Sequence, residues 1–181
     1  TSRLVLKNGV DDLIKGVAQV SRPASAEARQ SQPVKLLILG TGQDEATLRE
    51  LAKDVGIQDR VLFLGQIDHG ELPNYLKISD TFCRPSLSEG LGNSFLEAMA
   101  AGVPIIGTPV GGIVDFLEDR KTGLLCEVRS PASIAKAIET YRTNGELRRA
   151  IIAKGRELVM SHYDWAQIAQ RMHTIYERLL A

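Results

Sequence analysis

The sequence predicts an α/β fold, in which helices cover both faces of a parallel sheet and a helical extension follows. Two features lead to this prediction. Short apolar runs alternate with amphipathic stretches, and after residue 126 no further strand-like run occurs. Each run is shorter than a typical helix and rich in Val, Ile, Leu or Phe, as in strands buried on both faces. The predicted strands lie at 34–39, 61–64, 81–84, 104–107 and 123–126.

Amphipathic segments between these runs predict the helices that return the chain from one strand to the next. Because such alternation favours parallel strands, we expect a Rossmann-like sheet of about six strands with helices on both sides. The connection 21–33, which contains Ser, Gln, Ala, Glu and two Pro, is expected to be exposed. The predicted helices lie at 11–20, 45–55, 71–77, 94–101 and 113–117.

Residues 131–181 are predicted to form a helical tail, with helices at 131–142, 146–160 and 164–180. In the last helix, apolar and aromatic side chains recur at helical spacing. We expect this stripe to close the core of the domain itself; docking on a partner domain outside this sequence is the alternative. The stripe consists of Trp165, Ile168, Met172, Ile175, Tyr176 and Leu179.

The charge composition gives the chain no overall field that would attract nucleic acid or anionic lipid. Lys plus Arg and Asp plus Glu both number 22 in the 181 residues, so an anionic ligand must be held by a local cluster. Cys83 and Cys126 each lie in an apolar run, which favours buried thiols in a reducing compartment over a disulfide. No apolar stretch approaches the ~20 residues of a membrane span.

The first residues resemble neither a protein start nor a signal peptide. The opening lacks Met, and no apolar region follows Arg3. Arg3-Leu4-Val5 resembles the end of a strand already under way, so we expect a fragment that forms one domain over residues 1–181. We expect a cytoplasmic location, with the inner face of the membrane as one place of action.

The stretch 86–102, S-L-S-E-G-L-G-N-S-F-L-E-A-M-A-A-G, points most directly to a function. It follows a predicted strand and begins a helix, which puts it at the carboxyl edge of a parallel sheet, where open α/β folds bind ligands. Gly90 and Gly92 allow the backbone to approach a ligand closely. Asn93 or Ser94 is expected to cap the helix, whose free N–H groups suit a phosphate.

Two acidic residues in this stretch indicate a binding site when they are taken together. Glu97 stands in an apolar helix segment, where a carboxylate is costly unless it is paired or meets ligand hydroxyls such as those of a ribose. Taken alone, Glu97 is explained by the favourable helix dipole at the first turn. Glu89, eight residues earlier on the glycine-rich loop, favours a functional role for both.

Glu89 and Glu97, within Glu-Gly-x-Gly and Glu-Ala-Met-Ala-Ala-Gly-Val-Pro, resemble the signature of family 4 retaining glycosyltransferases of the GT-B fold. The resemblance extends over nearly the whole chain. It corresponds to the C-terminal domain of that fold, which binds the nucleotide-sugar donor. Further matching segments are 2–5, 9–14, 37–42, 61–65, 71–75, 79–86, 108–112, 121–125 and 163–165.

The resemblance implies a role for each residue of the site. Glu97 would bind the ribose hydroxyls, and Glu89 the hydroxyls of the donor sugar. An Arg and a Lys near the start of the domain would neutralise the diphosphate. Arg3 matches the first, while either Lys7 or Asn8 occupies the place of the second. The diphosphate would lie on the amides of Gly90, Leu91, Gly92, Asn93 and Ser94.

The resulting hypothesis is transfer of a sugar from a nucleotide-diphosphate sugar to a glycan, lipid or small-molecule acceptor, with retained anomeric configuration. Neither a metal nor a separate cofactor is expected. Acceptor groups, and any peripheral membrane contact, would come from an N-terminal domain outside this sequence, so the isolated domain is expected to be inactive. The alternatives are a non-catalytic nucleotide-binding or interaction domain, and another GT-B enzyme such as a nucleotide-sugar epimerase or a glycan phosphorylase.

Other signals carry less weight. Gly40-Thr41-Gly42 begins like a dinucleotide fingerprint, but Glu45 occupies the position of the third glycine. The three histidines lack ligand spacing and there is no Asp-x-Asp triplet, so no metal site is predicted. His69 is interpreted as a solvated loop residue and Arg84 as an unassigned polar end of a strand.

Overall fold

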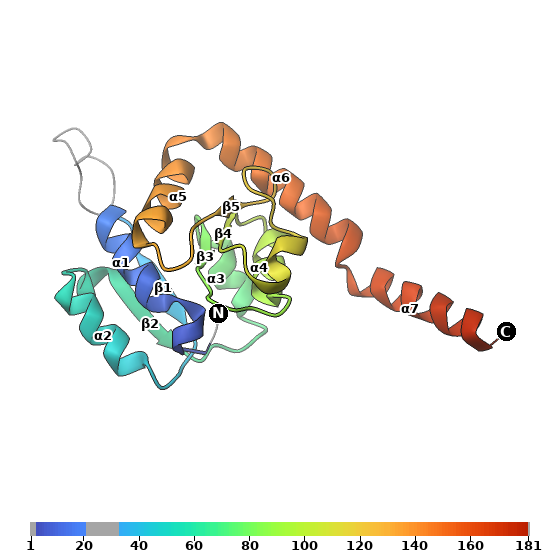
Figure 1. Ribbon diagram of the computed structural model, residues 1–181, viewed down its shortest axis with the longest axis horizontal. Coiled ribbons are helices and arrows are strands. Elements are labelled where there is room, and N and C mark those ends of the chain that lie inside the picture. The colour runs from blue at the N-terminus through green and yellow to red at the C-terminus, as the bar shows by residue number, and fades with distance from the viewer. Residues whose placement is uncertain (1–2, 21–32, 181) are drawn as a thin grey trace.

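Helices flank parallel strands throughout the part of the chain that the computed structural model describes, residues 3–20 and 33–180 (Figure 1). Each of the predicted apolar runs contains a strand, so the predicted α/β class is confirmed. The strands are β1 (Leu36–Leu39), β2 (Val61–Gly65), β3 (Phe82–Arg84), β4 (Ile105–Gly107) and β5 (Leu124–Leu125).

The helices follow the predicted order, with ends that differ by a few residues. The one change of type is at 113–117, where a 3-10 helix over Gly111–Asp115 replaces the predicted α-helix, beginning at a glycine with φ of 54°. Two further 3-10 helices cover Leu6–Asn8 and Gln58–Arg60. The α-helices are α1 (Val10–Val20), α2 (Glu45–Asp54), α3 (Leu72–Lys77), α4 (Asn93–Ala100), α5 (Pro131–Thr143), α6 (Gly145–His162) and α7 (Trp165–Leu180).

All strand pairs are parallel, but they form two hydrogen-bonded groups, β1–β2 and β3–β4–β5. The described residues therefore hold five strands, one fewer than the expected sheet of about six. Residues of both β1 and β3 line a small cavity of about 50 Å³, where the two groups face each other.

The segment 3–5, predicted to end a strand, is not a strand. The Leu4 N–H donates to the Thr41 carbonyl at 2.9 Å, and the Leu4 carbonyl accepts from the Asp44 N–H at 3.2 Å. Its backbone groups thus bond to the loop between β1 and α2, which leaves no ladder partner for a strand.

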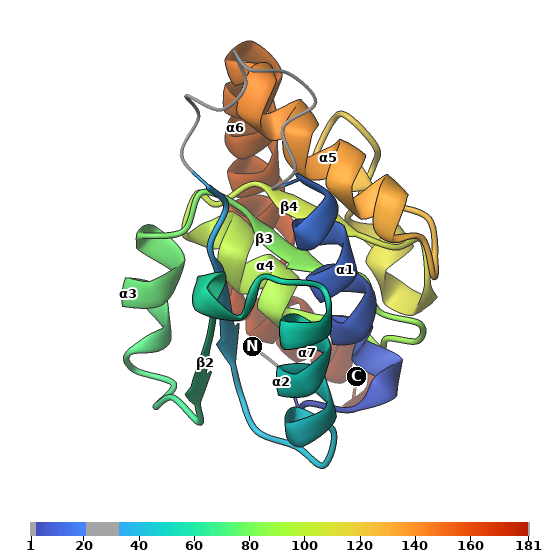
Figure 2. The ribbon, with the colours of Figure 1, turned by 90° about the vertical axis from the view of Figure 1, so that its left-hand side faces the viewer.

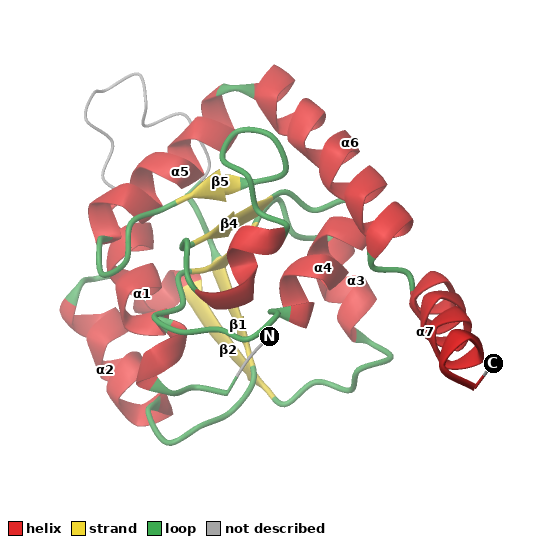
Figure 3. Ribbon diagram, turned by 45° about the vertical axis from the view of Figure 1, so that its right-hand side comes forward, coloured by secondary structure: helices red, strands yellow, loops and turns green. Residues whose placement is uncertain are grey.

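Two separate clusters of buried side chains show that helices cover both faces of the strands. One cluster joins α1, α2 and α5, and the other joins α3, α4 and the end of α6. In Figure 3 the strands lie between these two groups of helices, and Figure 2 shows α1 running beside α5. This arrangement confirms the Rossmann-like layering.

Helix α7 does not close the core, so the favoured prediction for its apolar stripe is wrong. It has no buried residue, and Trp165 is 79% exposed. In Figure 1 the helix extends away from the rest of the domain. The physical reason lies in α5 and α6, whose buried Ile134, Ile151 and Val159 already cover the apolar surface that α7 would have needed. The helix begins instead on a local cap, because the Asp164 carboxylate accepts from the N–H groups of the first turn at 2.9 and 3.2 Å.

In the described ranges, 3–20 and 33–180, no helix combines the length and the apolar character that crossing a bilayer requires.

Candidate functional site

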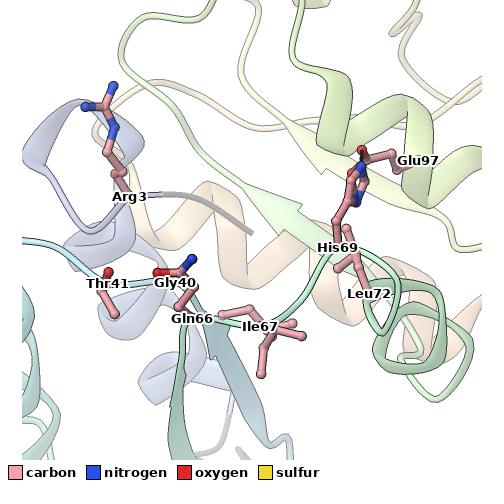
Figure 4. Close-up of a pocket in the computed structure, with 9 residues that line it drawn as sticks. Arg3, Gly40, Thr41, Gln66, Ile67, His69, Leu72 and Glu97 are labelled. Atoms are coloured by element: carbon pink, nitrogen blue, oxygen red, sulfur yellow. Dashed lines mark ion pairs between the residues drawn. The ribbon is translucent and has the colours of Figure 1, made fainter.

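An open cleft of about 530 Å³ lies beyond the carboxyl ends of β1 and β2 (Figure 4). Its volume is within the range of small-molecule sites, and open α/β sheets bind ligands at this edge. The lining residues come from the N-terminal segment, the end of β1, the loops that follow β1 and β2, and helices α3 and α4. They are Arg3, Leu39, Gly40, Thr41, Gln66, Ile67, His69, Leu72 and Glu97.

Glu97 reaches this cleft because the rest of its helix turn is buried. Phe95 is completely buried and stacks edge-on against Phe82 with ring centroids 5.2 Å apart, which fixes the rotation of α4. Leu96 and Ala98 are buried on either side, while the Glu97 side chain is 34% exposed. The carboxylate therefore meets solvent and the cleft, and it avoids the cost of full burial without a partner.

His69 lies beside Glu97 on one side of the cleft, away from Arg3 and Thr41 (Figure 4). Its Nε2 lies 3.7 Å from Oε1 of Glu97, and its side chain is 80% exposed on the loop after β2. The interpretation of His69 as a solvated loop residue is confirmed. Its place on the cleft was not predicted, because nothing local in the sequence relates residue 69 to residue 97.

Gly92 caps α4, and the prediction that Asn93 or Ser94 would do so is wrong. Gly92 adopts φ of 77° and ψ of 52°, and no side chain forms a cap hydrogen bond. Ser94 is buried and its hydroxyl accepts from Arg84, whereas Asn93 is exposed. With no side-chain cap, the first N–H groups of α4 remain suited to an anion.

The glycine-rich loop before α4 is held by the loop that follows β4. The Gly112 N–H donates to the Gly90 carbonyl at 2.9 Å, and the buried Thr108 hydroxyl donates to the Ser86 carbonyl at 2.5 Å. A side chain at Gly111 would meet the Glu89 carbonyl, since a β-carbon built there lies 1.9 Å from that oxygen. The glycines of the 108–112 segment therefore support the shape of the loop 86–92.

Glu89 is paired with Arg84, the residue at the end of β3. Nη2 of Arg84 lies 2.8 Å from Oε2 of Glu89, and the two side chains are only 16% and 14% exposed. The same carboxylate accepts from the Ser86 hydroxyl at 3.3 Å. Burial lowers the pKa of the Arg84 guanidinium, and the charge of Glu89 opposes that change.

The role of Arg84 was not predicted, although the sequence contains one signal for it. A charged residue at the end of a buried strand, close before an acidic motif, needs a partner. In the structure that partner is Glu89.

The N-terminal segment brings its three candidate residues to different environments. Arg3 lines the cleft, and Lys7 is exposed. Asn8 is only 2% exposed; its Nδ2 donates to the Arg3 carbonyl at 2.5 Å and its Oδ1 accepts from Arg84 at 3.1 Å. The segment is tied to the glycine-rich loop, because the Leu87 N–H donates to the Lys7 carbonyl at 2.7 Å.

The structure thus brings Arg3 and Glu97 to one cleft, while Glu89 turns toward Arg84 and does not line it. Among the exposed candidates are Lys7, Gly90, Leu91 and Asn93. Within residues 3–20 and 33–180, no group of three or more His, Cys, Asp or Glu side chains could hold a metal ion.

A Rossmann-like sheet with a cleft at its carboxyl edge, a basic residue and an acidic residue on that cleft, and a glycine-capped helix are typical of α/β domains that bind nucleotides. Within that class the family is clear. Residues 1–158 match the family model described as glycosyl transferases group 1, and the chain belongs to that family.

Curated relatives are about one-third identical to this chain over the aligned residues. The GDP-mannose-dependent alpha-(1-6)-phosphatidylinositol monomannoside mannosyltransferase of Mycobacterium tuberculosis is 35% identical over 178 residues, covering 94% of this chain and 44% of the relative. The N-acetyl-alpha-D-glucosaminyl L-malate synthase of Bacillus anthracis is 35% identical over 171 residues, covering 94% and 42%. The chain therefore spans less than half the length of these relatives.

Solved structures agree on the fold. The sucrose-phosphate synthase of Thermosynechococcus elongatus superposes with a TM-score of 0.86 at 29% identity, covering 99% of this chain and 44% of that protein. The Anabaena protein HepE, solved in complex with UDP, superposes with a TM-score of 0.86 at 22% identity, covering 98% and 47%.

Proposed function

We propose that this chain is the donor-binding domain of a retaining glycosyltransferase, which transfers a sugar from a nucleotide-diphosphate sugar to a glycan, lipid or small-molecule acceptor. One observation carries the proposal: Arg3 and Glu97, which are far apart in the sequence, line one cleft at the carboxyl edge of the strands. Names of relatives support it, since one is a GDP-mannose-dependent mannosyltransferase and another was solved with UDP.

Each proposed contact follows from the chemistry of a donor. The Glu97 carboxylate accepts two hydrogen bonds at once, which matches the 2′ and 3′ hydroxyls of a ribose. Glu89 accepts from hydroxyls of the transferred sugar. The diphosphate lies against Arg3 and the backbone N–H groups at the start of α4, where the loop Gly90, Leu91, Gly92, Asn93 and Ser94 leads into the helix.

Transfer requires stabilisation of the leaving group. As the bond between the sugar and the diphosphate breaks, negative charge grows on the diphosphate oxygen. Arg3, Lys7 and the helix N–H groups stabilise that charge, and they would do so without a metal ion. Because Arg3 lies on the N-terminal segment and the N–H groups on α4, the charge would be met from two directions.

Lys7 is a better candidate than Asn8 for the second diphosphate contact. Both ends of the Asn8 amide are engaged, with the Arg3 carbonyl and with Arg84, and the side chain is buried. The Lys7 side chain is exposed one residue earlier, on a flexible stem. We therefore propose Lys7 as the ligand and Asn8 as the support of its loop.

The remaining parts of the proposal concern the whole protein. Acceptor groups would come from an N-terminal domain, which would also make any peripheral contact with a membrane, so this chain alone is expected to bind donor but not to transfer sugar. The free thiols Cys83 and Cys126 support action in a reducing compartment such as the cytoplasm.

A calorimetric screen of UDP-, GDP- and ADP-sugars against this chain tests the proposal. We expect one nucleotide class to bind, with most of the affinity retained by the nucleoside diphosphate alone. A chain that binds none of them would favour the alternative of a non-catalytic interaction domain. Product analysis with the longer protein would then separate a transferase from a nucleotide-sugar epimerase.

A further inference from the structure

We infer that Arg84 is a positioning residue of the donor site, which holds Glu89 and the N-terminal segment carrying Arg3 in one fixed arrangement. The inference rests on the proposed function, because it assigns Arg84 to the placement of two proposed donor ligands. Arg84 is not among the residues that line the cleft, and we place its action in the residues it contacts.

The guanidinium of Arg84 joins three segments that are remote in the sequence. Nη2 contacts Oε2 of Glu89 at 2.8 Å and Oδ1 of Asn8 at 3.1 Å, and Nη1 donates to the Ser94 hydroxyl at 3.0 Å. One side chain therefore bonds to the glycine-rich loop, to the first turn of α4 and to the N-terminal segment.

The contact to Asn8 extends this arrangement to Arg3. Asn8 accepts from Arg84 with its carbonyl oxygen and donates to the Arg3 carbonyl with its amide nitrogen at 2.5 Å. A continuous set of hydrogen bonds thus runs from the backbone of Arg3 through Asn8 and Arg84 to Glu89. Arg84 therefore connects Arg3 and Glu89, the two residues proposed to contact the sugar nucleotide.

An apolar residue at the end of β3 would avoid the free-energy penalty of burying a charge. The presence of Arg84 there therefore indicates a role other than packing. The Arg84 side chain is mostly buried, and its Nε has no hydrogen-bond partner among the described protein atoms. An unpaired buried donor and a desolvated charge both oppose folding. The bridging of Glu89, Asn8 and Ser94 is the feature that offsets these costs.

Lysine cannot replace this bridge, because the ammonium is a single point on a flexible stem, whereas the guanidinium is a planar fork with separate donors. Without Arg84, the Ser86 hydroxyl at 3.3 Å is the other contact of the Glu89 carboxylate in the described structure. We expect Glu89 to leave its present orientation in that case and to turn toward solvent.

A double-mutant cycle with Arg84→Met and Glu89→Gln tests the inference by calorimetry. The probes are UDP-glucose and GDP-mannose, together with UDP and GDP. If Arg84 acts through Glu89, each single variant weakens sugar-nucleotide binding by on the order of tenfold, and the double variant loses clearly less than the sum of the two single losses, the remainder being the contribution of the Asn8 branch. The matched control is Arg148→Met, which removes an arginine of α6 whose side chain is 38% exposed and lies 3.7 Å from Asp80.

Arg84→Lys keeps the charge and the stem, and it covers the case in which Arg84→Met does not fold. We expect it to fold, as judged by amide NMR, and still to lose part of the sugar-nucleotide affinity. Additive losses in the cycle, or a lysine variant that binds as tightly as the parent, overturn the inference while the proposed function stands. A parent chain that binds none of the probes overturns both.

Discussion

Gly111, in the loop after β4, lies directly against the backbone of Glu89 in the loop 86–92, so the two loops pack as one unit. A β-carbon on residue 111 would lie 1.9 Å from the Glu89 carbonyl oxygen, and φ at Gly111 is 54°. Both the space and the backbone conformation therefore require glycine. The carbonyl belongs to the residue proposed to bind the donor sugar, so packing and ligand placement depend on the same contact.

Gly111→Ala is expected to lower both the stability and the donor affinity of the chain, because the added methyl group must displace the Glu89 backbone. Gly56→Ala is the matched control: it also has a positive φ, of 73°, but nothing lies within 4 Å of the place that its methyl group would occupy. The control should cost only the backbone strain of about 1–2 kcal/mol. Urea unfolding and calorimetry with the bound nucleotide measure the difference, and equal losses in the two variants would contradict this account.

Glu97→Gln removes the charge of the proposed ribose ligand and keeps its shape. Hydrogen bonds to a charged group contribute about 1.5–3 kcal/mol, so the affinity for the nucleotide should fall by roughly 10–100-fold. Glu146→Gln, in the exposed first turn of α6, serves as the control and should bind like the parent. Unchanged affinity of the Glu97 variant would remove the ribose assignment.

Arg3→Met and Lys7→Met should each weaken binding of a nucleoside diphosphate by about tenfold, since each removes a charge-assisted contact. They should leave binding of the corresponding nucleoside unchanged, because it has no phosphate. Titrations at low and high salt measure both effects. Lys154→Met, on the exposed side of α6, controls for a general change in charge. A variant that loses nucleoside affinity equally would show that its residue does not act on the diphosphate.

The buried thiols should make the free energy of unfolding depend on alkaline pH. Burial raises the pKa of Cys126 from 9.0 to about 12, and burial also raises the pKa of Cys83 well above its ordinary value. The folded chain keeps protons that the unfolded chain releases near pH ~8.5. The contribution of the thiols to the free energy of unfolding is therefore fully present below that pH, and it is lost as the pH rises toward 12.

Cys126→Ala isolates one of these protons. Its free energy of unfolding should fall less steeply between about pH 8.5 and 10, by up to ~1.4 kcal/mol per pH unit. Urea unfolding at several pH values in this window gives the slope, whatever the absolute stability of the variant. A slope identical to that of the parent would show that Cys126 ionises equally well in the folded chain.

Helix α7 should contribute little to the stability of the domain, because none of its residues is buried. A helix of this length is marginal in water without packing, so its amides should exchange with solvent far faster than those of α1. Removing residues 165–181 should change the unfolding free energy by less than ~0.5 kcal/mol. Ile134→Ala, at a fully buried position of α5, should cost ~2–5 kcal/mol by comparison. Slow exchange throughout α7 would reveal a packing partner in solution.

The α/β class and the place of the site were predictable because their signals are local. Alternating apolar runs identify parallel strands, and the Glu97 motif directly follows one of them, so the sheet edge fixes its position. The prediction of Glu97 at a cleft needed only the order of elements.

The fate of α7 and the role of Arg84 were not predictable in this way. Periodicity shows that one face of a helix is apolar, but it does not show whether α5 and α6 have already covered the core. The pairing of Arg84 with Asn8 joins residues 76 positions apart, and no spacing rule relates them. The predicted cap of α4 was wrong for a more local reason. The Ser94 hydroxyl accepts from Arg84, and Gly92 occupies the N-cap position.

The bond between the Leu87 N–H and the Lys7 carbonyl, at 2.7 Å, has a consequence for how a ligand is captured. It joins the N-terminal segment, which carries Arg3, to the glycine-rich loop that leads into α4, and it does so without a ligand. Ordering entropy is then lost during folding and not again during association, which favours tight binding from few contacts. Binding of a ligand to this chain should consequently cause only small backbone shifts in NMR titrations.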